Sequence, residues 1–256
     1  VERLDMRTVD GRNLLGLGLD EVRKVKRTLA SAGIEVPTFV SPVLKWSAPG
    51  HPAADGKPVD FAFDPGQCPA PDPVLHAFEV AGTLEARRLR VFSYLRYEGY
   101  RPGDLAAETD RLLALAERFD VIVEMENEPV CNVGSVAELA AFFWATPAAG
   151  RLRPLVDIGN SWSMGAPPTA ADIASLAPTV DLIHLKDRSL AARRTVPLGD
   201  GDVPWPMELA RLLAGCRSPQ VLASLETHCP QDGRNATARS VAALRRIAAE
   251  IGVELV

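Results

Sequence analysis

Short apolar runs alternate with stretches of helical spacing along the whole chain. The apolar runs are rich in Val, Ile, Leu or Phe, which is typical of buried strands. The predicted strands are Val1–Met6, Glu35–Val40, Leu89–Leu95, Val121–Met125, Leu152–Val156, Val180–Leu185 and Val221–Leu225. Between them, apolar residues recur at helical spacing, and the predicted helices are Leu19–Ala32, Gly103–Phe119, Val136–Ala145, Ala170–Leu176, Pro206–Leu213 and Thr237–Ile251.

This alternation predicts an α/β fold in which helical crossovers join parallel strands. In a chain of 256 residues it favours a TIM (β/α)8-type barrel, with residues 1–256 as a single domain. Seven strand-like runs are present, and Val1 lies at once inside the first of them. We therefore expect this sequence to lack the first βα unit, so that Val1 begins the second strand of the barrel. A seven-stranded or open sheet is the alternative.

One connection in the predicted barrel is unusually long. Residues 47–73 are rich in Pro, Gly and Asp and have no hydrophobic period, whereas most βα connections have about 2–6 residues. Because this segment follows a strand, it would lie on the C-terminal face of a barrel, where active sites are built. It is either a lid over the site or a tolerated insertion.

Acidic and imidazole side chains stand at the ends of four successive predicted strands. Glu126 follows VIVEM, Asp157 follows LRPLV, His184 lies within DLIHL, and Glu226 follows VLASL. The ends of parallel barrel strands converge on one face, where three carboxylates would repel one another unless a cation compensated them. Carboxylate oxygens with one imidazole suit Mn²⁺, the ion we prefer, and also Mg²⁺, Co²⁺ or Zn²⁺. The pattern predicts a four-ligand metal site.

Each of these residues, taken singly, has an ordinary alternative. A carboxylate at a strand end can cap the following helix, and a lone histidine can be a hydrogen-bonded core residue. Their joint occurrence at four strand ends favours the site. Period-2 alternation also places Glu124 inward below Glu126, where Arg90 is the expected partner, with an outward Glu124 as the alternative.

Five motifs occur in the order of a known family. They read ENEP at 126–129, DIGN at 157–160, HLKD at 184–187, PLGDGDVPW at 197–205 and SLE at 224–226. With them the chain resembles the sugar phosphate isomerase/epimerase group, also described as xylose isomerase-like or AP endonuclease family 2 barrels. The resemblance spans nearly the whole chain, and HLKD with LGDGDVPW is its most specific part. It implies a TIM barrel in which Glu126, Asp157, His184 and Glu226 bind a divalent metal.

For epimerases of this group, the resemblance further implies that Glu126 and Glu226 move protons on opposite faces of the substrate. The chemistry is consistent with that role. Moving a proton next to a carbonyl needs a base within hydrogen-bond reach and stabilisation of the enediolate oxygen that is left behind. A chelated cation would supply the stabilisation, and the two glutamates would supply the base.

Four further residues are candidate substrate contacts. Many epimerases of the group carry a histidine where this chain has Asn160, and His228 either takes part of that role or forms a structural hydrogen bond. Lys186 either enters the site beside His184 or forms a surface ion pair with its neighbour, Asp187. Trp162 is either a wall for a sugar face or a core residue.

The leading functional hypothesis is a divalent-metal-dependent isomerase or epimerase of a ketose, sugar acid or polyol, acting by proton transfer through a metal-bound enediolate. The alternatives are a lyase of the inosose or dehydroshikimate dehydratase type, which then expels a β-hydroxyl, and a non-catalytic barrel subunit. A DNA-repair endonuclease would need a histidine-rich zinc cluster and a basic face. Four histidines and a net charge of -5 disfavour it.

The composition limits the kinds of binding partner that we expect. No apolar run approaches the roughly 20 residues of a membrane-spanning helix, and the first residues do not read as a signal peptide. We expect a cytoplasmic protein with a small sugar-like substrate and with no nucleic-acid or membrane partner. The four cysteines are scattered and are expected to be free thiols. The exposed helices of such a barrel can form interfaces between copies of the chain, so a homo-oligomer is also possible.

Overall fold

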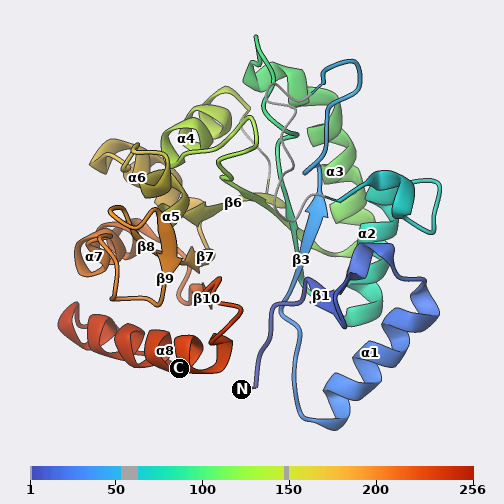
Figure 1. Cartoon of the computed structure of the whole chain (residues 1–256). Coiled ribbons are helices and arrows are strands. Elements are labelled where there is room, and N and C mark those ends of the chain that lie inside the picture. The colour runs from blue at the N-terminus through green and yellow to red at the C-terminus, as the bar shows by residue number, and fades with distance from the viewer. Residues whose placement is uncertain (1, 53–62, 147–149) are drawn as a thin grey trace. The chain divides into compact units, whose positions relative to one another are not determined.

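A computed structural model of the chain describes residues 2–52, 63–146 and 150–256 (Figure 1). The chain divides into two compact units. The first comprises Val1–Glu126, Val130–Asn132 and Ala145–Arg153, and the second comprises Asn127–Pro129, Val133–Trp144 and Pro154–Val256. One boundary between the units therefore falls between Glu126 and Asn127, directly after a strand.

The first unit contains three parallel strands. They are β3 (Thr38–Val43), β4 (Arg88–Val91) and β5 (Ile122–Glu126), and β4 pairs with both of the others. Their fully buried side chains include Phe39, Leu89 and Val123. Within residues 2–6 of the predicted first strand, isolated parallel bridges join Arg3 to Glu35 and Met6 to Phe39 of β3. A short antiparallel hairpin follows it, made of β1 (Thr8–Val9) and β2 (Arg12–Asn13).

Three α-helices accompany these strands: α1 (Leu19–Ser31), α2 (Pro73–Leu84) and α3 (Ala106–Phe119). The helix α2 packs against both α1 and α3 (Figure 1). The 3-10 turns of this unit are η1 (Leu14–Gly16), η2 (Pro65–Gln67) and η3 (Pro102–Leu105). The sequence patterns predicted α1 and α3 but not α2, which buries apolar side chains around most of its circumference and so has no clear polar face. Its start is nevertheless encoded locally, because Asp72 accepts hydrogen bonds from the backbone N–H groups of Val74 and Leu75.

The second unit repeats this arrangement. Its parallel strands are β6 (Leu152–Asp157), whose first two residues belong to the first unit, β7 (Leu182–Leu185) and β10 (Leu222–Leu225), and β7 pairs with both of the others. The antiparallel pair β8 (Asp187–Ser189) and β9 (Arg194–Val196) follows β7 directly. The helical elements are α4 (Val136–Ala145), α5 (Ile158–Ser163), α6 (Ala170–Leu176), η4 (Ala177–Thr179), α7 (Trp205–Gly215) and α8 (Gly233–Glu250).

The predicted alternation of strands and helices is confirmed in both units, with parallel pairing throughout the main strands. Two expectations fall on residues outside the described ranges. The proposed lid at 47–73 includes residues 53–62, and the expectation that Val1 begins the second barrel strand concerns residue 1; both stay predictions. Among residues 2–52, 63–146 and 150–256, no helix has the length and apolar character needed to cross a membrane.

Candidate metal centre

Asp157 ends β6 and is completely buried. Its Oδ1 accepts a hydrogen bond of 2.7 Å from the backbone N–H of Asn160, so the side chain caps the N-terminus of α5. Its Oδ2 lies 3.0 Å from the ammonium of Lys186. Helix capping and a place in a polar cluster were alternatives for this residue in the sequence, and one carboxylate serves both because each oxygen has its own partner.

His184 lies on β7, where the strand register places it opposite Asp157 on β6 and Ser224 on β10. Its side chain is fully buried, and Nδ1 lies 3.3 Å from Oε1 of Glu226. Glu226 directly follows β10, and its backbone N–H donates to the carbonyl of Leu185. Adjacent parallel strands therefore bring Asp157, His184 and Glu226 to the same end of this sheet.

Lys186 extends the polar cluster. Its ammonium lies 2.8 Å from Oε2 of Glu226, in addition to its contact with Asp157, and the side chain is only 9% exposed. The alternative of a surface ion pair with Asp187 does not describe this residue. A single ammonium lies between two carboxylates, which places one positive charge against two negative ones.

The donor atoms of this cluster match a divalent cation. Asp157, His184 and Glu226 each offer one ligand atom, and these atoms lie within 4.8 Å of one another. Two carboxylate oxygens and one imidazole nitrogen form a mixed hard and borderline donor set, which suits Mn²⁺, Mg²⁺, Co²⁺ or Zn²⁺. The residues present therefore fit a metal ion.

Glu126, the fourth predicted ligand, ends β5 in the first unit and is buried. Its Oε2 accepts a hydrogen bond of 2.9 Å from Nη1 of Arg90. The expected pair of Arg90 with Glu124 stays a prediction, and two other contacts of these residues are observed. The strand register does set Arg90 opposite Glu124, but the guanidinium reaches forward to Glu126, and Arg88 lies 3.4 Å from the buried carboxylate of Glu124.

Two asparagines build the framework around Asp157. The side chain of Asn127 accepts from the backbone N–H of Asp157 at 2.9 Å and donates to its carbonyl at 2.9 Å. Asn160, predicted to contact substrate, donates through Nδ2 to the carbonyl of Asn127 at 2.7 Å. The amide nitrogen of Asn160 thus belongs to the framework, and its Oδ1 is the atom that a substrate contact would use. The sequence offered Asn127 only as part of the ENEP motif.

His228 lies beside Glu226, with Nε2 3.3 Å from Oε2 of that carboxylate. Its backbone adopts a left-handed conformation with φ of 45°, and 36% of its side chain is exposed. Of the predicted substrate contacts, Lys186 and His228 thus both contact Glu226, one buried and one accessible from solvent. This places an imidazole ring, which can donate or accept a hydrogen bond, on the exposed side of Glu226.

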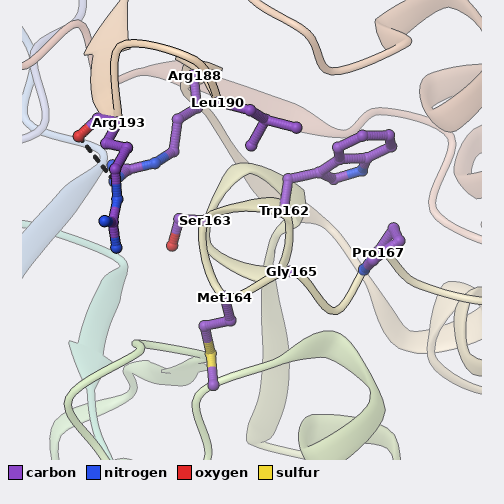
Figure 2. Close-up of a pocket in the computed structure, with 8 residues that line it drawn as sticks. All are labelled: Trp162, Ser163, Met164, Gly165, Pro167, Arg188, Leu190 and Arg193. Atoms are coloured by element: carbon purple, nitrogen blue, oxygen red, sulfur yellow. Dashed lines mark hydrogen bonds between the residues drawn. The ribbon is translucent and has the colours of Figure 1, made fainter.

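Trp162 lies on α5, five residues after Asp157, and is half-buried. It lines a pocket of about 360 Å³ between α5 and the β8–β9 segment (Figure 2). Glu208 on α7 is buried, and this burial raises the pKa of its carboxyl group, while Arg211 and the indole N–H of Trp162 lower it. Trp162 is therefore both a pocket wall and a neighbour of a buried acid.

Asp187 is a buried anchor that sequence reasoning singled out only as a partner for Lys186. Its carboxylate accepts backbone N–H groups from four residues of the following segment, at 2.8 to 3.3 Å: Arg188, Gly199, Gly201 and Val203. Burial nevertheless raises its pKa. A Cβ added to Gly201 would overlap this carboxylate, and a Cβ added to Gly159 would overlap the carbonyl oxygen of Lys186. The glycine of the DIGN motif thus allows the backbone to lie directly against Lys186, and the second glycine of the LGDGD motif allows it to lie directly against Asp187.

A family model described as xylose isomerase-like TIM barrel matches residues 2–247. The match covers nearly the whole chain, and it confirms the fold class expected from the sequence. A search of curated protein sequences gave no match.

Solved structures give the same fold. The IOLI protein with a bound zinc atom is 14% identical, with a TM-score of 0.69, and the alignment covers 98% of this chain and 89% of that one. A xylose isomerase-like TIM barrel protein from Mycobacterium smegmatis, in complex with magnesium, is 14% identical, with a TM-score of 0.68 and coverage of 98% and 85%. The 3-keto-D-glucoside 4-epimerase YcjR from E. coli is 13% identical, with a TM-score of 0.61 and coverage of 90% and 85%. At these identities the likeness is one of fold.

Proposed function

The chain belongs to the xylose isomerase-like TIM barrel family, and from this premise we propose that it is a divalent-metal-dependent isomerase or epimerase of a small sugar-like substrate. The observation that carries the proposal is the convergence of ligand atoms from Asp157, His184 and Glu226 within 4.8 Å. Fold neighbours that bind zinc or magnesium, and one that is an epimerase, agree with this class of activity.

We assign Glu126 as the fourth ligand. It is peptide-bonded to Asn127, whose side chain holds the backbone of Asp157 through two hydrogen bonds. Arg90 fixes one oxygen of the Glu126 carboxylate at 2.9 Å and so orients it. Mn²⁺ is the ion we favour; when bound, it would stabilise the negative charge that develops on substrate oxygens as a proton leaves.

In this proposal Glu226 and Glu126 exchange the proton, one on each face of the substrate. Glu226 is held by His184, Lys186 and His228, all with contacts of 2.8 to 3.3 Å, so its carboxylate is positioned before substrate binds. Lys186 and His228 are donors that can turn from Glu226 to substrate oxygens. Asn160 and Trp162 would complete the substrate contacts, the first through its Oδ1 and the second through its ring face.

The proposal is tested by measuring bound metal and proton exchange on the same protein. After loading with Mn²⁺, the protein is incubated in deuterium oxide with ketoses, sugar acids and inososes, and deuterium incorporation next to the carbonyl is followed by NMR. We expect one metal ion per chain and exchange on at least one class. The Glu226→Gln variant should lose roughly 10²-fold or more in exchange rate, whereas Glu250→Gln, on the exposed end of α8, should match the parent protein.

The products decide between the reactions that begin with this proton transfer. Epimers or aldose–ketose pairs support the proposal, while loss of water would identify a lyase that uses the same carboxylates. A protein that binds Mn²⁺ but exchanges no proton on any class contradicts the enzymatic proposal and favours a barrel that only binds its ligand.

A further inference from the structure

The pocket beside Trp162 has a composition that the proposed reaction does not by itself require. Its wall combines the indole of Trp162 with Met164 and Leu190, and both of these apolar side chains are exposed, at 39% and 43%. Arg188 and Arg193 also line it, and no carboxylate does. Figure 2 shows the arginines on one side of the pocket and Trp162 on the other. The pocket thus has an apolar wall facing two positive charges.

The two guanidinium groups are available to a ligand. Within residues 2–52, 63–146 and 150–256, neither Arg188 nor Arg193 forms an ion pair. Nη2 of Arg188 donates to the backbone carbonyl of Arg193 at 3.0 Å, the contact drawn in Figure 2. This hydrogen bond holds the two residues together across the β8–β9 connection. A guanidinium has five donors, so most of those on Arg188 stay available.

The pocket is built on the same segments as the metal ligands. Helix α5 is capped by Asp157 itself, and Trp162 follows it by five residues, which is roughly 7–8 Å along a helix at 1.5 Å per residue. Strand β8 follows Lys186 without a gap and carries Arg188. The absence of a side chain at Gly159 lets α5 lie directly against the carbonyl of Lys186. A substrate of sugar size that engages Asp157 and Lys186 therefore has the pocket within its reach.

We propose that this pocket binds an oxyanion group of the substrate, so that the substrate is a sugar phosphate or a sugar acid rather than a neutral sugar. Two guanidiniums can each bind a phosphate or carboxylate through paired N–H donors, and the indole face packs against the C–H groups of a sugar. This inference rests on the proposed function for the reaction, but the pocket itself can be tested by binding alone.

The experiment compares three matched probes: D-fructose, D-fructose 6-phosphate and D-fructuronate. Binding to the Mn²⁺-loaded protein is measured by calorimetry, and deuterium exchange is measured in parallel. The test variants are Arg188→Gln and Arg193→Gln, with Arg188→Lys as a version that keeps the charge. Arg194→Gln is the control, because Arg194 is the exposed neighbour that does not line the pocket. Circular dichroism and thermal unfolding confirm that each variant is folded.

We expect the anionic probes to bind at least 10-fold more tightly than D-fructose to the parent protein and the Arg194→Gln control, and this advantage to disappear in both pocket variants. Partial retention in Arg188→Lys would support a charge-based site. If the arginine variants lose the binding advantage of D-fructose 6-phosphate alone, the pocket is a phosphate site. If they lose the advantage of D-fructuronate alone, it is a carboxylate site. Equal binding of all three probes, or an anionic preference that survives Arg188→Gln and Arg193→Gln, would overturn the inference. If the preference depends on these arginines but no probe exchanges deuterium, the pocket stands and the proposed reaction fails for these substrates.

Discussion

The buried charges of the two units are arranged differently. In the first unit two buried glutamates each lie close to an arginine: Arg88 lies 3.4 Å from Glu124, and Arg90 lies 2.9 Å from Glu126. In the second unit Asp157 and Glu226 share the single ammonium of Lys186. The two arginines and two glutamates of the first unit balance in charge. In the second unit, two carboxylates and one ammonium leave one excess negative charge when His184 is neutral.

The two cations also differ in how firmly they are held. The guanidinium of Arg90 donates to the carbonyls of Val40 and Ser41 as well as to Glu126, so its position is fixed from several directions. An ammonium on a flexible stem is a point charge that can move by changing rotamers. The first arrangement therefore serves to hold a strand end in place. The second leaves room for an added cation, which is what a metal site requires.

The largest effect is expected from removing the fixed cation. Arg90→Met leaves the buried carboxylate of Glu126 without its guanidinium, and breaking a buried ion pair in this way costs about 3–5 kcal/mol. Urea unfolding should show this loss, and adding Glu126→Gln to the variant should recover part of it. Arg87→Met, one strand position before the pairs and exposed, should change stability by less than about 0.5 kcal/mol. An equal loss at Arg87 would show that strand disruption, rather than an unpaired charge, is responsible.

The next effect separates the two glutamates of β5. Glu126→Gln keeps the size of a proposed ligand and base but removes its negative charge, so proton exchange should fall by roughly 10²-fold or more in the Mn²⁺-loaded protein. Glu124→Gln is the matched change on the same strand, at a carboxylate paired with Arg88. It should leave the exchange rate of the folded protein within a few-fold of the parent. If a fully metal-loaded Glu126→Gln protein exchanges at the parent rate, the two-base mechanism is wrong.

Removal of the shared ammonium tests the second arrangement. In Lys186→Met the carboxylates of Asp157 and Glu226 lose their common partner, so the metal-free protein should lose about 1–3 kcal/mol of stability. Mn²⁺ would replace the missing charge, and the gap in melting temperature between variant and parent should shrink when the metal is added. Lys26→Met removes a lysine that contacts the largely exposed Glu85, and it should show no such rescue. A gap that Mn²⁺ leaves unchanged would argue that this cluster does not bind the ion.

The smallest effect concerns Glu208, a buried acid whose ion pair with Arg211 is long, at 4.0 Å. Burial raises the pKa of Glu208 above its ordinary value of 4.5. When the pKa of a carboxyl group is higher in the folded than in the unfolded protein, protonation stabilises the fold. This stabilisation is complete below the pKa of the unfolded state, and it is lost as the pH rises through the pKa of the folded state. The Glu208→Gln variant should therefore have the same stability as the parent protein near pH 4. At pH 8 it should be slightly more stable than the parent, by about 1 kcal/mol or less. Melting curves at both values measure this, and lower stability of the variant at pH 8 would show that the ionised carboxylate stabilises the fold.

Local chemistry in the sequence predicted most of the secondary structure. The helices α1, α3, α4, α6, α7 and α8 and the main strands follow from hydrophobic spacing. The helix α2 was missed because its apolar residues surround it, and α5 was missed because six residues are too few to display a period. The strand ends at Asp157, His184 and Glu226 could be identified because parallel strands carry their terminal residues to one edge of a sheet.

The sequence alone thus determined which residues stand at the strand ends, since strand formation and chain direction are local properties. Only the tertiary structure decided which charges meet. Arg90 stands opposite Glu124 in the strand register but reaches Glu126, and Lys186 contacts two carboxylates at the ends of other strands. A long side chain spans several residue positions. Its partner is therefore selected by the packing and the charges around it in the folded protein, and not by its place in the sequence.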